Sequence, residues 1–210
     1  MIIKPNKRRS RYTLEINDNA DIIIKTPLNP SQRIINKLIS ENQGWIKKHQ
    51  SRQHEIKQNL ADWYKKDLLF YRGKKTLFKQ NLDQSTHFSK DLILIPKGKT
   101  KEAFLKQHAR LYLPERCLDI AQRMSINVHS ISIRKMTSCW GTCNRQGKVT
   151  LNEALIQVPD WVSDYVMVHE CAHITHFDHS KQFWALVADY TDQIKEAKNW
   201  LKDHQSVLIN

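Results

Sequence analysis

The chain has 210 residues, 40% of them hydrophobic, and a formal charge of +13 from 34 Lys and Arg against 21 Asp and Glu. No apolar run approaches the roughly 18 residues of a membrane span, and the first residues lack the apolar core of a secretory signal, so we expect no membrane contact. Four cysteines are too few for a disulfide scaffold. These features predict a cytoplasmic protein with reduced thiols.

The basic residues are concentrated in one half of the chain. Residues 1–110 hold 24 Lys and Arg against 10 Asp and Glu, net +14, whereas residues 111–210 hold 10 against 11, net −1. A basic region can attract nucleic acid, a nucleotide or another polyanion. The same lysines can also form a solvated surface, and they are scattered in pairs rather than gathered in one run. Binding of nucleic acid or nucleotide by this half is therefore one of two open interpretations.

In chain order, the first elements predict a β-rich part with one helix. Asn29 as N-cap and Pro30 as the first helical residue predict a helix that continues to about residue 53. β-branched and alternating runs predict strands before and after it. The expected strands are 12–16, 21–26, a hairpin over 67–82, and 91–95. We expect residues 1–98 to form this basic N-terminal part.

The second part of the sequence has longer helices and two short strands. Apolar residues at helical spacing predict a long helix over 99–124, which Pro114 is expected to kink or split. The other expected elements are strands at 128–134 and 148–152, a loop over 137–147, and helices beginning at Pro159, at Ser180 and around Trp200. Residues 99–210 would form this second part, either separate from residues 1–98 or continuous with them in one domain.

The most informative motif is H-E-x-x-H, formed by His169, Glu170 and His173 inside a predicted helix. Residues four apart lie on the same helix face, so both imidazoles can reach one metal ion. Glu170 lies next to that face, where it can accept a proton from a metal-bound water. Cys171 faces away from the histidines and is expected to be a core residue.

A catalytic zinc takes three protein ligands and leaves one position for water. His179, six residues after His173, reaches the metal if the chain turns back beyond the helix. His176 lies closer but would crowd the first two ligands. Glu196 is a further candidate, because a glutamate from a following helix can complete such a site. The residues favour His179 and leave the other two open.

Three segments resemble the YgjP-like metallopeptidases, which are zincin-like proteins alongside the WLM and SprT groups. They are TSCWGTCNRQGKVTLN, DYVMVHECAH and the following HS with FW, and the resemblance is strong over about residues 130–201. The resemblance implies that His169, His173 and His179 bind one Zn²⁺ per chain and that Glu170 is the general base. It also implies an α+β fold: a zincin-like catalytic core with the active-site helix packed on a small, mostly antiparallel sheet, plus a basic N-terminal α+β part.

The family's W-G-[ST]-C loop is present as Trp140 to Cys143, and Cys139 stands where an arginine commonly precedes the tryptophan. In zincin folds an edge strand beside the active-site helix pairs with an extended substrate chain. The resemblance therefore makes Trp140, Ser138 and Asn152 candidates for a substrate cleft. Trp140 has the alternative of a core tryptophan that holds the loop to the helix.

Ligand histidines usually donate their second ring N–H to an oxygen, and Asp178 or Asp164 is expected to supply it. Tyr165, one turn before His169, is expected to point into the fold and not toward a substrate.

The sequence thus predicts a zinc-dependent hydrolase, above all a metallopeptidase that cleaves peptide or protein amides. One alternative keeps the metal and hydrolyses nucleotides or other phosphoanhydrides. The other is a nucleic-acid-associated protease or binding module that uses the basic half.

Overall fold

The computed structural model describes residues 1–17 and 19–208, except for the side chains of 56, 57, 59–65 and 205–207. The chain divides into two compact units, Met1–Asp62 and Trp63–Asn210. The division falls well before residue 98, the boundary that the expected elements predicted. The reason is that the strands after residue 67 bury Leu69, Phe78 and Ile93 in the same core as the helices of the second unit.

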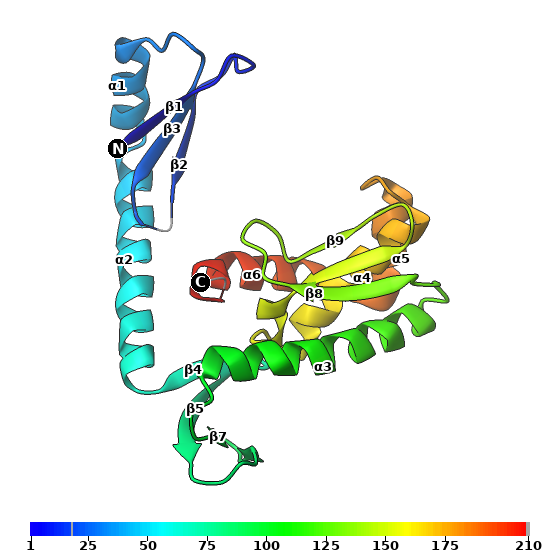
Figure 1. Ribbon diagram of the computed structural model, residues 1–210. Helices are drawn as coiled ribbons and strands as arrows, with labels where there is room; N and C mark the ends of the chain where they lie inside the picture. The colour runs from blue at the N-terminus through cyan, green and yellow to red at the C-terminus, as the bar shows by residue number, and fades with distance from the viewer. Residues whose placement is uncertain (18, 209–210) are drawn as a thin grey trace. The chain divides into compact units, whose positions relative to one another are not determined.

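The first unit combines a three-stranded sheet with helical residues (Figure 1). Its strands lie in the order β1-β3-β2, with β1 parallel and β2 antiparallel to β3. The core of this unit is formed mainly by Ile24, Ile35 and Ile46, which are all buried. The elements are β1 (Ile2–Pro5), β2 (Thr13–Ile16), β3 (Ile22–Thr26), α1 (Gln32–Glu41) and α2 (Gln43–Lys65).

The single helix expected here is two helices, and it begins two residues later than the sequence suggested. Ser31, not Asn29, is the N-cap of α1, and its backbone N–H donates to the hydroxyl of Tyr12 at 2.8 Å. At Asn42 the side-chain amide donates to Leu38 O at 2.8 Å, and the backbone N–H donates to Ile39 O at 3.2 Å. These bonds cap α1, so a new helix begins at the following residue.

The second unit contains two sheets and four α-helices among its described residues. One sheet has the order β4-β5-β7-β6, and the other has the order β8-β10-β9. The strands are β4 (Leu68–Tyr71), β5 (Lys74–Asn81), β6 (His87–Phe88), β7 (Leu92–Pro96), β8 (Ser130–Arg134), β9 (Gly141–Cys143) and β10 (Lys148–Asn152). The helices are α3 (Lys101–Arg123), the 3-10 turn η1 (Glu153–Ile156), α4 (Asp160–Thr175), α5 (Lys181–Tyr190) and α6 (Ile194–Leu208).

The expected α+β architecture is confirmed, with three differences of detail. The small sheet next to α4 is mixed, because β10 is parallel to β8 and antiparallel to β9. Helix α3 continues without a break through Pro114. Strand β9 falls inside the segment expected to be a loop, and it forms one edge of the sheet (Figure 1).

Helix α4 is the centre of the second unit and packs against α3, α5, α6, β9 and β10. Most of its residues are buried, including Val162, Met167 and Ala172. A helix buried on nearly all sides is held by packing rather than by intrinsic propensity, so its position is strongly determined.

The start of α4 is held by the β4–β5 turn. Arg72 and Gly73 both have positive φ, as the tight turns of hairpins require. Their backbone N–H groups donate to the carbonyls of Ile156 and Gln157 at 2.9 Å each. A Cβ on Gly73 would lie only 2.5 Å from Cγ of Pro159, so this close approach needs glycine.

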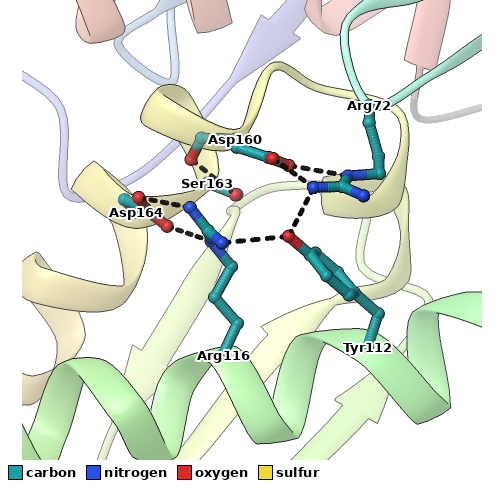
Figure 2. A network of polar contacts seen from close by, with 6 residues as sticks. All are labelled: Arg72, Tyr112, Arg116, Asp160, Ser163 and Asp164. Carbon is teal, nitrogen blue, oxygen red and sulfur yellow. Dashed lines mark hydrogen bonds and ion pairs between the residues drawn. The ribbon is translucent and has the colours of Figure 1, made fainter.

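Two arginines continue this attachment through the network in Figure 2. Arg72 forms an ion pair with Asp160, and Arg116 of α3 forms one with Asp164. Both guanidinium groups also donate to the hydroxyl of Tyr112, at 2.9 and 3.0 Å. The network ties α3 and the hairpin to the first two turns of α4. Among the described residues, no helix combines the length and apolar character that crossing a membrane requires.

Candidate metal centre

Helix α4 carries His169, Glu170 and His173, and it ends at Thr175 as the chain leaves helical geometry. His176 has extended backbone angles, and its N–H donates to Ala172 O at 2.9 Å. The exposed residues after it then turn back toward the helix. The motif therefore lies in the last two turns of a rigid, buried element.

The turn that returns His179 to the helix is stabilised by local hydrogen bonds. The Asp178 carboxylate accepts from Ser180 N at 3.2 Å, and Ser180 Oγ accepts from Phe183 N at 3.4 Å. Ser180 is thus the N-cap of α5, as its position in the sequence predicted. The fixed start of α5 determines where the preceding histidine lies.

The three histidines form a cluster of metal-ligand geometry. One ring nitrogen from each of His169, His173 and His179 lies within 4.8 Å of the others. Nε2 of His169 and Nε2 of His179 are 3.3 Å apart. Tetrahedral zinc with Zn–N bonds of about 2.0–2.1 Å sets its nitrogens about 3.3–3.4 Å apart, so the His169–His179 pair has the spacing of this ion, and three imidazole nitrogens are a donor set that zinc takes. Phe183 packs on all three rings, with centroid distances of 4.6–4.9 Å.

The protonation of the rings also suits a metal. Nδ1 of His173 lies 3.1 Å from His176 O, so this nitrogen carries the proton and Nε2 is free to bind. Burial, followed by the charges of His173, His179 and Lys198, lowers the pKa of His169 to about 4. Burial also lowers the pKa of His173. Neutral imidazole is the form that binds a metal.

Nδ1 of His169 is buried and has no hydrogen-bond partner among the described residues. The two carboxylates expected to serve the ligand histidines are engaged elsewhere. Asp164 pairs with Arg116, and Asp178 accepts from Ser180. The backbone carbonyl of His176 serves His173 instead.

Glu170 lies beside the histidines in a desolvated position. Its residue is 6% exposed, and burial raises the pKa of its carboxyl to about 7. The backbone of Gly141 in β9 lies directly against it: a Cβ there would be 2.6 Å from Glu170 Cγ. The glycine of the Trp140–Cys143 loop therefore provides the space that the glutamate fills.

A cavity of about 400 Å³ opens beside Glu170 and His169. Its other lining residues come from β9 and the loop before it, from α4 and from α6: Cys139, Trp140, Gly141, Tyr165, Val166, Lys198, Leu201 and Lys202. Tyr165 was expected to point into the fold. It is buried, as expected, but its side chain lines this cavity, and burial raises the pKa of its hydroxyl to about 12 with a smaller contribution from Glu170.

The three candidate cleft residues are placed differently. Trp140 lines the cavity and also packs on the core. Ser138 is exposed and is not among the residues that line the cavity. Asn152 is 1% exposed: its amide donates to Met136 O and Cys139 O, and its Oδ1 accepts from Ala154 N. Asn152 therefore shapes the loop and has no hydrogen left for a substrate.

Of the competing third ligands, His176 and Glu196 are absent from the cluster of described residues. Cys171 is fully buried, as expected for a core residue. All four cysteines are free thiols. Lys198 and Lys202 were not anticipated, because two exposed lysines on a helix resemble any solvated surface in the sequence.

The chain matches a known protein family. A family model described as the YgjP-like metallopeptidase domain matches residues 10–204. No curated protein matches. The crystal structure of the metallopeptidase zymogen of Pyrococcus abyssi abylysin is 23% identical, with 44% of this chain and 92% of that chain covered and a TM-score of 0.38. The family match spans most of both units, so the chain belongs to the YgjP-like family, whose domain is a metallopeptidase domain.

Proposed function

We propose that this protein is a zinc-dependent metallopeptidase that hydrolyses amide bonds in peptides or proteins. The observation that carries the proposal is the convergence of three histidine nitrogens beside a buried glutamate at the edge of a cavity. Membership of a metallopeptidase family supports the same reaction class. We assign one Zn²⁺ to His169, His173 and His179.

The residues of this chain have distinct roles in that reaction. Zinc at the three histidines would supply an acidified water and polarise the scissile carbonyl. Glu170 takes a proton from the attacking water on a carboxylate oxygen and then donates it to the leaving amine nitrogen. Its burial suits this double role, because a carboxyl with a pKa near 7 can both accept and release a proton near neutral pH.

Strand β9 provides a place for the peptide backbone. Among the described strands it pairs only with β10, so its other edge is open. An extended chain added along 141–143 would pass Glu170, against which Gly141 is packed. We propose that the substrate binds as an added strand on this edge.

The test is Glu170→Gln, with Glu115→Gln on the exposed face of α3 as the matched control. Metal content is measured by mass spectrometry, and cleavage is measured with a quenched-fluorescent peptide library. We expect both variants to keep about one zinc per chain, while Glu170→Gln loses at least about 100-fold in rate. Full activity in Glu170→Gln would refute the role of this residue.

The alternatives of nucleotide hydrolysis and nucleic-acid binding keep their sequence support, the net +14 of residues 1–110. Release of phosphate from a nucleotide panel would favour the first, and DNA retention that falls steeply with salt would favour the second. We propose the cytoplasm as the location, where the four free cysteines would stay reduced.

A further inference from the structure

The cavity beside Glu170 has a strongly basic wall. Lys198 and Lys202 of α6 both line it, and because they are four residues apart they project from the same helix face. Among the described lining residues, Glu170 carries the only carboxylate. His169 also lines it, so the candidate metal centre adjoins a cavity whose charged lining consists of two ammonium groups and one carboxyl group.

Lys198 is held close to the candidate metal centre. Its Nζ lies 3.8 Å from the ring centroid of Trp184. That ring is in turn 5.7 Å from the rings of both His169 and His179. This cation–π contact orders the lysine without neutralising it. Among the described residues, neither Lys198 nor Lys202 forms an ion pair with an acidic side chain.

The rest of the cavity suits a short apolar stem. Trp140, Val166 and Leu201 supply carbon surface, and the Tyr165 ring completes it. The Tyr165 hydroxyl has no hydrogen-bond partner among the described residues. A ligand with a hydrocarbon stem and an anionic, hydrogen-bond-accepting end would satisfy the apolar wall, the hydroxyl and the two ammonium groups together.

We propose that this cavity binds a carboxylate of the peptide substrate, with Lys198 and Lys202 as its specificity-determining residues. This inference rests on the proposed peptidase function, since the cavity adjoins the scissile position through Glu170. The carboxylate has two sources in a peptide: an acidic side chain beside the scissile bond, or the free C-terminus. The first makes the protein an endopeptidase selective for acidic sites, and the second makes it a carboxypeptidase.

The experiment measures binding and cleavage separately. Zinc-loaded Glu170→Gln protein is titrated with fluorescent hexapeptide mixtures in two matched pairs: Glu against Gln at one internal position, and free against amidated C-terminus. The same titrations are done with Lys198→Glu and Lys202→Glu added, singly and together. Lys195→Glu, an exposed lysine of α6 outside the cavity, is the control of equal charge change. Cleavage of the same peptides is assayed with the wild-type protein and with the lysine variants that keep Glu170.

We expect the carboxylate member of one pair to bind about tenfold more tightly, and this preference to vanish in the double lysine variant but not in Lys195→Glu. Which pair shows it identifies the source. Equal binding within both pairs, or a preference that survives the double variant, overturns the proposal. If the wild type cleaves peptides without such a preference, the peptidase function is supported and the carboxylate-binding cavity is refuted. If no peptide is cleaved but the carboxylate members still bind more tightly, the peptidase function is refuted and the carboxylate-binding cavity is supported.

Discussion

Replacing Gly141 by alanine would place a methyl group where Glu170 now lies. The new Cβ would be 2.6 Å from Glu170 Cγ, 2.8 Å from Oε1 and 2.9 Å from Cδ, whereas ordinary contact begins at 3.4 Å. The glutamate must therefore move by about 0.8 Å at Cγ, the difference between 3.4 and 2.6 Å. Because its side chain is buried, it cannot swing into solvent and must leave its place beside the histidines.

A displacement of about 1 Å in a catalytic group can cost about 100-fold in rate, which corresponds to about 2.7 kcal/mol in the activation free energy. Overpacking at a buried position costs a further 1–3 kcal/mol or so of stability. We expect Gly141→Ala to keep the zinc, because the ligand histidines are untouched, and to lose about 100-fold in kcat on the peptide library.

Gly44→Ala is the matched control, because a Cβ at Gly44 in α2 meets nothing within 4 Å. It should leave kcat unchanged and stabilise the protein by up to about 1 kcal/mol, since alanine is the better helix former. A folded, zinc-containing Gly141→Ala protein with wild-type kcat would show that the position of Glu170 is not limiting, and would refute this reasoning.

Three further predictions concern the metal, the ion pairs and acid. Chelation should lower the Tm of the wild type but not that of His179→Ala, because a metal bound only to the folded state stabilises it; equal shifts by calorimetry would contradict the three-histidine site. Arg116→Met should cost about 1 kcal/mol in urea unfolding, since its partner Asp164, whose side chain is 26% exposed, would be left unpaired, and adding Asp164→Asn should cost little more. Burial alone would raise the pKa of Asp160, but the hydrogen bond and charge of Arg72 outweigh it and lower that pKa below its usual 3.8. A carboxyl whose pKa is lower in the folded than in the unfolded protein stabilises the fold at pH values above its unfolded-state pKa. This stabilisation is lost as the pH falls through its folded-state pKa. The free energy of unfolding between about pH 5 and pH 3 should therefore fall less steeply in Arg72→Gln than in wild type.

The cluster of three histidines was the part of the candidate site that the sequence predicted best. The spacing of His169 and His173 follows from helix geometry alone, and the cap at Ser180 is a local signal that also fixes the return of the chain. The basic wall of the cavity could not be predicted from the sequence, because it depends on tertiary packing and not on a local pattern. Lys198 and Lys202 acquire their meaning only from the packing of α6 against α4, which no local pattern encodes.

Errors in the sequence reasoning arose where tertiary contacts decide. The side chain of Asn152 is of a type that often binds substrates, but its amide donates both of its hydrogens to two carbonyls of the preceding loop. Strand β9 is too short to show alternation, so it was assigned to a loop. Strands β4 and β5 were grouped with the N-terminal residues because they lie in the basic half of the sequence. The charge of a segment does not show in which core its apolar side chains are buried.

The pairing of β9 with β10 makes the chemistry depend on strand register. Gly141 pairs with Leu151 and Thr142 with Thr150, and it is this alignment that sets a glycine against Glu170. Successive residues of a strand face opposite sides, so a slip of one residue would bring the bulk of Trp140 or Thr142 to the glutamate. The hydrogen bonds from Asn152 to the loop before β9 oppose such a slip. Insertions or deletions in residues 135–140 should therefore be tolerated far less well than substitutions there, although none of those residues needs to touch the metal.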